Sequence, residues 1–262
     1  MQNVVINLAG RPVSCRYTDD HLRQMMGSRV DSTRAVGRAL ELAARPPAVW
    51  LQMSTATIYA DRRDAPNDEA RGTIGGHEPG VPAYWEFSVR IAQHWEAAQQ
   101  EATLPHTRRV AMRTAMVMSP DRGGVFDYLL WMARLGLGGP VAGGGQYVSW
   151  IHAHDLCRAI ELLVDRSDLD GPVNLASPNP LPQGELMRDL RRAWGRRPGL
   201  PATRSMAALG AWALRTDTEL LLKSRRVVPG RLLDAGFAFE HSTWPDAAAD
   251  LVAGVRERRK RS

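Results

Sequence analysis

Cysteine is nearly absent from this chain, and lysine is almost as rare. Two cysteines, Cys15 and Cys157, stand among 262 residues, which is too few for a disulfide framework or for the cysteine spacing of a zinc site. We therefore expect both to be small packed side chains in a reducing compartment, the cytoplasm. Only two of the 34 basic residues are lysines, Lys223 and Lys260. Any chemistry that needs a lysine earlier in the chain is excluded.

The chain also lacks long apolar runs. No stretch approaches the roughly 18 consecutive apolar residues of a transmembrane helix. The opening segment, MQNVVINLAG, has no basic residue before its apolar part, so it does not resemble a secretory signal. No membrane partner is expected. Because 44% of the residues are hydrophobic and 24% are charged, the chain should bury a proper core, as one large domain or two small ones.

Charge of one sign is in excess, but it is not concentrated. The net charge is +6 and the calculated pI about 9.9, which raises the question of nucleic acid as a partner. The basic residues are mostly interleaved with acids, and the one dense run is the final RERRKRS, residues 256–262. We interpret that run as a solvated, frayed terminus and expect no nucleic-acid partner.

Apolar periodicity predicts alternating strands and helices over most of the chain. Strands are expected at residues 3–8, 48–51, 109–117, 146–151 and 171–176, and helices at 18–40, 83–103, 125–135, 152–164 and 185–194. Such alternation is typical of a parallel sheet covered on both faces. Further helices are expected at residues 207–214, 219–222 and 231–235, and from Thr243 onward. Thr18 and Thr243 suit helix starts, and Gly195 suits a helix end.

Small hydroxyl residues follow the second predicted strand. The sequence STATIYA, residues 54–60, places Ser54, Thr55 and Thr57 directly after it. In an open parallel sheet, ligands bind beyond the carboxyl ends of the strands, where such hydroxyls can hydrogen-bond a substrate or cofactor. Serine and threonine also simply end strands and begin turns. Both interpretations remain open on spacing alone.

Eight stretches, taken together and in order, resemble a known family. They are VINLAG (5–10), GSRVDSTRAV (27–36), STATIYA (54–60), HWEAA (94–98), MRTAMVMSPDRGG (112–124), LGLGGPVAGGGQYVSWIHAHDL (135–156), GPVNLASPNP (171–180) and ELLLKSRRVVPGRLLDAGFAFEHSTWPDA (219–247). The chain resembles the atypical extended short-chain dehydrogenase/reductases of the NAD(P)-dependent epimerase/dehydratase superfamily. It is most similar to the branch of nucleoside-diphosphate-sugar epimerase-like proteins that ends in a domain of unknown function.

The resemblance implies a fold and a division of the chain. The fold is α/β: a Rossmann-like, doubly wound parallel sheet lacking its first strands, because the chain begins where the family has its fourth strand. A small, mostly helical C-terminal region follows. We expect residues 1–177 to form a partial NAD(P)-binding epimerase domain and residues 178–262 a helical domain of unknown function.

The resemblance also assigns residues to the site. It implies NADP or NAD as cofactor, a small or nucleotide-linked carbonyl or sugar as substrate, and allows a homodimer. The catalytic residues carried over are Thr55, Ser54 and Tyr84; the cofactor contacts are Asn7, Ala9, Gly10, Arg113 and Thr114; the substrate contacts are Gly143, Gly144, Gly145, Gln146 and His152. No metal is expected, since His152, His154 and Asp155 alone offer too few ligands.

Two family motifs are missing. No G-x-x-G-x-x-G opens a helix after a strand, although those glycines let a backbone approach the pyrophosphate. No Tyr-x-x-x-Lys is present, because Tyr84 is followed four residues later by Ser88. Two functions therefore stay open: an NAD(P)-dependent epimerase or oxidoreductase, and a catalytically inactive relative that acts as a binding or scaffold protein.

Overall fold

The structure is a computed structural model, and it describes residues 3–12, 15, 18–78, 85–196, 199–203 and 222–261. The strands are β1 (Val4–Asn7), β2 (Val49–Thr55), β3 (Arg108–Thr114), β4 (Met116–Met118), β5 (Tyr147–Val148), β6 (Trp150–His152), β7 (Gly171–Leu175) and β8 (Leu181–Pro182). The helices are α1 (Asp19–Glu41), η1 (Ala56–Ile58), α2 (Trp85–Gln100), α3 (Val125–Arg134), α4 (Ala153–Asp165), α5 (Gln183–Trp194), α8 (Gly230–Asp234) and α9 (Trp244–Arg261).

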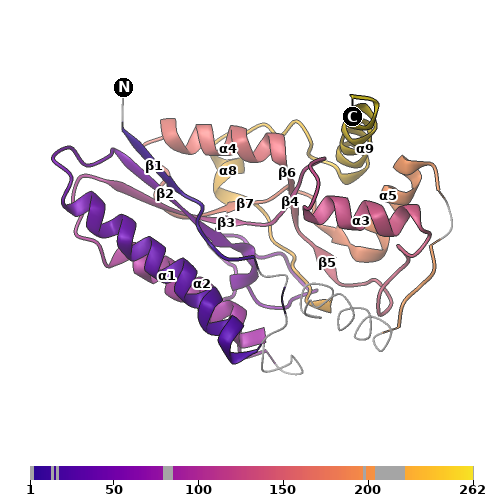
Figure 1. Ribbon diagram of the computed structural model, residues 1–262, viewed down its shortest axis with the longest axis horizontal. Helices are drawn as coiled ribbons and strands as arrows, with labels where there is room; N and C mark the ends of the chain where they lie inside the picture. Colours follow the sequence, from indigo (N-terminus) through magenta and orange to yellow (C-terminus); the bar gives the residue numbers. More distant parts are fainter. Residues whose placement is uncertain are drawn as a thin grey trace.

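A four-stranded sheet in the order β1-β2-β3-β7 organises the N-terminal part, and each neighbouring pair is parallel. Within the described residues β1 pairs with β2 alone and lies at one edge. Helices cover both faces of the sheet: α1 and α2 lie on one side, and α4 and α8 lie on the other (Figure 1). The α/β fold that the alternation predicted is confirmed.

The faces of the sheet are apolar because its strands are buried on both sides. Trp50 packs with Leu40 of α1 and with Ala102 and Leu104 beyond α2. On the opposite face Val110 and Met112 pack with residues of α4 and α8, among them Leu163 and Leu232. These two cores hold the strand ends at fixed positions.

The chain switches sheets at two points, where the sequence predicted unbroken strands. Ala115 still donates its amide to Leu175 of the first sheet at 3.0 Å, whereas the next amide, that of Met116, donates to Ser149 at 3.2 Å. The strand predicted at 109–117 is therefore two, β3 and β4, and β4 pairs with β6. The strand predicted at 146–151 is likewise broken at Ser149, and β5 pairs with β8 instead.

A second layer is built from α3, α5 and α9 around a core of its own. Phe126, Trp150, Leu190 and Trp244 are among its buried members. The Trp150 and Trp244 rings meet edge-to-face with centroids 5.0 Å apart, and Trp244 Nε1 donates to the carbonyl of Leu186 at 2.8 Å. Residues from both sides of the expected 177/178 boundary thus share one core. That boundary stays a prediction.

The predicted helix ends agree with the structure where it describes them. The Thr18 hydroxyl accepts the amide of His21 at the start of α1, and Gly195 ends α5 in the left-handed conformation, at φ 90°. Thr243 donates to Asp246 at 2.6 Å as α9 begins. The prediction of a frayed end was wrong, because α9 continues through Arg261. The helix predicted at 207–214 and most of that at 219–222 lie outside the described residues.

Candidate functional site

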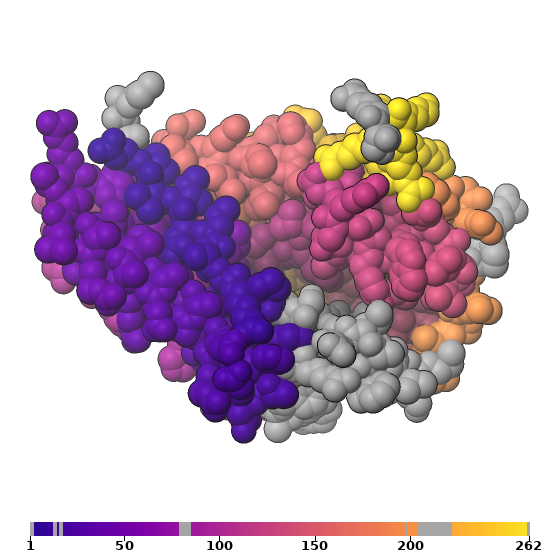
Figure 2. Space-filling view, viewed as in Figure 1, coloured from indigo at the N-terminus to yellow at the C-terminus, as the bar shows by residue number. Residues whose placement is uncertain are grey.

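Polar side chains gather where the parallel strands end. Asn7 closes β1, Ser54 and Thr55 close β2, and Arg113 and Thr114 close β3. Ser54 is in register with Arg113, and Arg113 with Asn174 of β7. Because all four strands are parallel, these residues lie together at the carboxyl ends of the strands, where ligands of α/β proteins bind. We call this end of the sheet its carboxyl edge. Figure 2 shows a hollow between the N-terminal segment, coloured indigo, and the segment of α3, coloured magenta.

A buried network joins three of the strand ends to α2. Arg113 forms two 2.8 Å hydrogen bonds with the Glu96 carboxylate, and the Ser54 hydroxyl donates to the same carboxylate at 2.6 Å. The Tyr59 hydroxyl accepts from Arg113 at 3.0 Å and donates to Asn174 Oδ1 at 2.9 Å. Each of these buried polar side chains therefore has a hydrogen-bond partner within the network, as buried polar groups in native proteins generally do.

The network shifts the pKa values of Arg113 and Tyr59. Burial works to lower the pKa of Arg113, but the hydrogen-bonded Glu96 carboxylate outweighs it, so the pKa lies above its ordinary value. Burial raises the pKa of Tyr59 against the opposing effect of Arg113. At neutral pH the network consequently holds a charged Arg113 guanidinium and a neutral Tyr59 phenol.

The two threonines of the strand ends differ in their surroundings. Thr55 caps η1: its hydroxyl accepts the amide of Thr57 at 3.2 Å and lies 3.1 Å from the Thr57 hydroxyl, and it is half-buried. Thr114 is buried and donates to the carbonyl of Met112 at 3.1 Å. Of these two threonines, Thr55 is the less buried.

The turn after β1 is held by a side chain. Asn7 donates to Gln52 Oε1 at 3.0 Å and accepts the amide of Ala9 at 3.0 Å. Ala9 and Gly10 are exposed, and a side chain at Gly10 would lie against the Arg29 side chain at 3.4 Å. Of the three residues expected to contact the cofactor here, Asn7 is buried and Ala9 and Gly10 are exposed, all at the carboxyl edge.

The glycine segment expected to contact substrate is anchored on α5. Gly143 and Gly144 have φ values of 89° and 69°, and Gly144 accepts the amide of Gly184 at 2.9 Å. Gln146 is buried and donates to the carbonyl of Val141 at 3.2 Å. Gly143 and Gly145 remain exposed, so only the tips of this loop are open to a ligand.

His152 lies at the other end of the expected substrate segment, in a different setting. It caps α4 by accepting the amide of His154 at 3.1 Å. His152 is 5% exposed, and its ring lies beside His241 and Asp250. Its described contacts are thus with the C-terminal segment and not with the network around Arg113. Tyr84, the third catalytic candidate, lies outside the described residues.

Sequence reasoning missed two members of this edge. Glu96 was detectable: it follows Val89 and Ala92 at helical spacing, and both are buried, so a carboxylate there faces inward. Lys223 was not detectable, because it lies far along the chain. Its ammonium donates to the carbonyl of Thr57 at 3.2 Å, and it is 3% exposed. A lysine therefore reaches the end of β2 without belonging to a local motif.

Comparison with known proteins gives relatives that span nearly the whole chain. The family model described as a domain of unknown function, DUF1731, matches residues 207–251. Human epimerase family protein SDR39U1 is 28% identical over 256 residues, covering 96% of this chain and 82% of the relative. Epimerase family protein Mb2239 of Mycobacterium bovis is 30% identical over 248 residues, covering 94% and 77%.

Solved structures agree with the sequence relatives. The crystal structure of human SDR39U1 with NADPH has a TM-score of 0.85 at 26% identity, covering 97% of this chain and 82% of that one. A nucleoside-diphosphate sugar epimerase from Corynebacterium glutamicum has a TM-score of 0.70 at 21% identity, covering 99% and 54%. In the described residues, no helix is both long and apolar enough to span a bilayer. The chain belongs to the epimerase family, in the atypical extended short-chain dehydrogenase/reductase branch that carries this C-terminal domain of unknown function.

Proposed function

We propose that the chain is an NADP(H)-binding epimerase or oxidoreductase that acts on a small or nucleotide-linked carbonyl or sugar. The observation that carries this proposal is the convergence of Asn7, Thr55, Arg113 and Asn174 at the carboxyl edge of a parallel sheet. It is supported by the similarity to a human protein crystallised with NADPH and to a Thermus thermophilus UDP-glucose 4-epimerase in complex with NAD, which has a TM-score of 0.69.

The residues at the edge suit the reactive end of such a cofactor. Ala9 and Gly10 are exposed beside the strand ends, and Arg113, at the end of β3, is buried. A bound nicotinamide would supply hydride transfer. In this proposal Asn7 shapes the turn and Arg113 with Thr114 lines the nicotinamide end.

Thr55 is the hydroxyl that can serve the substrate. Its Oγ is half-buried at the end of β2, where it could donate to a substrate oxygen as negative charge develops there. Ser54 contributes indirectly, because its hydroxyl is engaged by Glu96 at 2.6 Å. Gly143, Gly145 and His152 are proposed to border the substrate side, with the glycines as the exposed part.

A matched pair of glycine variants tests the cofactor site. We expect the wild-type chain to bind NADPH saturably in the micromolar range. Tryptophan fluorescence measures the binding, with NADH as the comparison. Gly10→Val should weaken binding at least about ten-fold by blocking backbone approach. Gly145→Val, at an exposed glycine of the other loop, should leave it unchanged. Equal effects of both variants would contradict the placement of the cofactor.

A catalytically inactive binding or scaffold protein is the second candidate. The observation in its favour is that Ser54, Tyr59 and Arg113 are already bonded to one another or to Glu96 and Asn174, and that the chain has no Tyr-x-x-x-Lys. Absence of NADPH and NADH binding by a chain with a folded circular dichroism spectrum would favour this function. Saturable binding would favour the first.

A further inference from the structure

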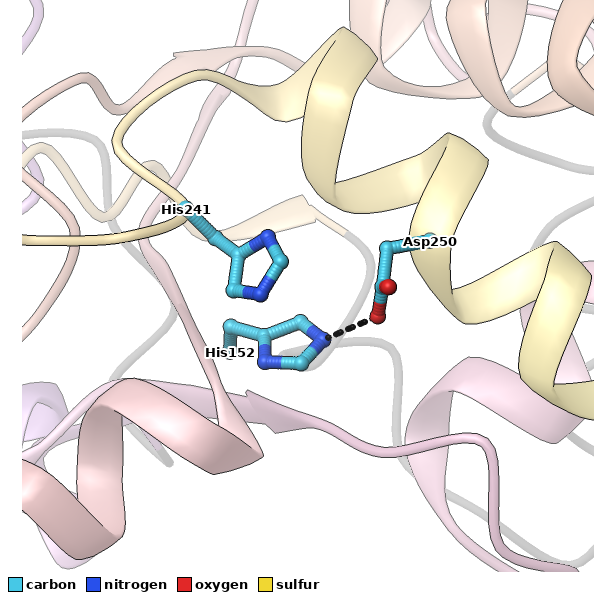
Figure 3. Close-up of side chains that lie close together, drawn as sticks. All are labelled: His152, His241 and Asp250. Carbon is cyan, nitrogen blue, oxygen red and sulfur yellow. Dashed lines mark ion pairs between the residues drawn. The ribbon is translucent and has the colours of Figure 1, made fainter.

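Three potential metal ligands meet where the C-terminal segment crosses the end of β6. His152 ends β6, His241 precedes α9, and Asp250 lies on α9. The potential ligand atoms of all three lie within 4.8 Å of one another. His152 Nε2 is 3.3 Å from Asp250 Oδ2, and the two imidazole rings lie 3.8 Å apart at 33°. Figure 3 shows both rings beside the Asp250 carboxylate.

His152 Nε2 is the least satisfied atom of the group. It is buried and has no hydrogen-bond partner, although the Asp250 carboxylate lies close to it. Buried polar atoms are nearly always hydrogen-bonded in native proteins. A buried nitrogen without a partner therefore needs an explanation, such as a bound ion. The other two ligands differ in access: the Asp250 side chain is 57% exposed, and His241 is partly buried. An ion could therefore enter from the Asp250 side.

We propose that His152, His241 and Asp250 form a binding site for a divalent transition metal, with Zn²⁺ as the best match. Two imidazole nitrogens and one carboxylate oxygen are a ligand set that zinc uses, with bonds of about 2.0–2.2 Å. A tetrahedral ion with such bonds sets its ligands about 3.3–3.5 Å apart, which the 3.3 Å between His152 Nε2 and Asp250 Oδ2 satisfies. His241, on a loop, needs only to turn toward the pair. Water would complete the fourth position.

The hydrogen bond by which His152 caps α4 opposes metal binding. Because His152 Nδ1 accepts the amide of His154, the neutral ring carries its proton on Nε2, facing Asp250. A metal on Nε2 displaces that proton, the ring proton moves to Nδ1, and the cap bond is lost. Burial and His241 lower the pKa of His152, while Asp250 and Asp155 oppose them and His154 adds to them, so the ring is neutral at pH 7. The proton stays on the ring, so binding at His152 exchanges one neutral tautomer for the other and releases no proton from this residue.

Titration of the untagged, chelator-treated chain with ZnCl₂ tests the site. We expect one ion per chain by calorimetry. Co²⁺ should give the visible absorption of a low-coordinate site. Asp250→Asn and His241→Gln should each weaken Zn²⁺ binding at least about ten-fold while keeping the fold, since neither side chain is fully buried.

His154→Gln is the matched control. His154 lies at the start of the same helix and pairs with Glu240 at 3.1 Å in an exposed position, outside the proposed ligand set. It should leave Zn²⁺ affinity unchanged. The proposal is overturned if the wild-type chain binds no stoichiometric Zn²⁺, or if Asp250→Asn and His241→Gln bind it as tightly as wild type. Loss of binding in His154→Gln with retention in Asp250→Asn would also overturn it.

Discussion

The Arg113–Glu96 pair shows how one buried contact can shape a site. Its side chains are 10% and 17% exposed, so both charges have left most of their water. Such a pair need not stabilise the fold relative to apolar residues, but removing one partner leaves the other charge unpaired. The pair also fixes Ser54 and Tyr59, through hydrogen bonds of 2.6 Å to Glu96 and 3.0 Å from Arg113. Arg113 and Glu96 together therefore hold Ser54 and Tyr59 in place at the carboxyl edge.

Glu96→Gln should destabilise the chain by about 3–5 kcal/mol, because it leaves the Arg113 charge buried without a counter-charge. Urea unfolding at neutral pH measures the change. Glu101→Gln is the control, since Glu101 forms a similar bidentate pair with Arg34 in which the side chains are about half exposed, and its effect should be much smaller. Comparable losses of unfolding free energy in the two variants would show that burial does not make the Arg113–Glu96 pair more costly to break.

His152 gives the stability of the chain a pH dependence. Its pKa is lowered in the folded state, so below about pH 6.5 the unfolded chain binds a proton that the folded chain resists. Stability should fall as the pH falls from 7.5 to 5.5. In the presence of a chelator, this loss should be smaller in His152→Asn, which retains a side chain able to cap α4. An identical pH dependence in both proteins would contradict the shift.

Some residues of the site could be predicted and others could not. Ser54, Thr55, Arg113 and Thr114 follow predicted strands, so a parallel sheet brings them to one edge. Lys223 could not be found this way, because a tertiary contact with Thr57 places it there. The same is true of Asp250, which meets His152 only through the docking of α9. Which of these residues contact a ligand stays a prediction.

At the scale of elements, the sequence predicted helices better than strands. Helix ends carry local signals, such as Thr18 and Gly195, and both functioned as expected. The breaks at Ala115 and Ser149 have no local signal. They arise because successive amides bond to different sheets, which depends on segments far apart in sequence.

The last helix, α9, is part of the core, which a single variant can test. Trp244 is 1% exposed, packs on Trp150 and donates to Leu186. Trp244→Ala should cost about 3–5 kcal/mol, the range for truncating large core aromatics. Trp131→Ala, at a tryptophan that is 46% exposed, should cost far less. Thermal and urea unfolding measure both, and a small effect at Trp244 would mean that α9 docks loosely.

At the scale of the molecule, the C-terminal segment ties the two layers together. Val227 forms a bridge with Asn67, and its amide donates to the Ser149 hydroxyl at 2.8 Å. Ser149 also donates to the carbonyl of Arg225 at 2.7 Å. One short stretch thus contacts the loop beyond β2 and the point where β5 passes into β6.

Because of these ties, the chain should unfold in one cooperative transition. Tryptophan fluorescence, which reports on both layers, and far-UV circular dichroism should give the same urea midpoint. The measurement needs no variant. Two separated transitions would show instead that the layer of α3, α5 and α9 is an independent folding unit.

The sheet switch at Ala115 has a mechanical consequence. Ala115 is bonded to β7 while its neighbour Met116 is bonded to Ser149, and Thr114, one residue earlier, lines the carboxyl edge. The chain passes between the two sheets here without a loop. Any tilt of one sheet against the other must therefore bend this joint, and the strain would reach Thr114 and Arg113 first. A change in the angle between the two sheets would therefore be transmitted directly to the strand end that carries Arg113 and Thr114.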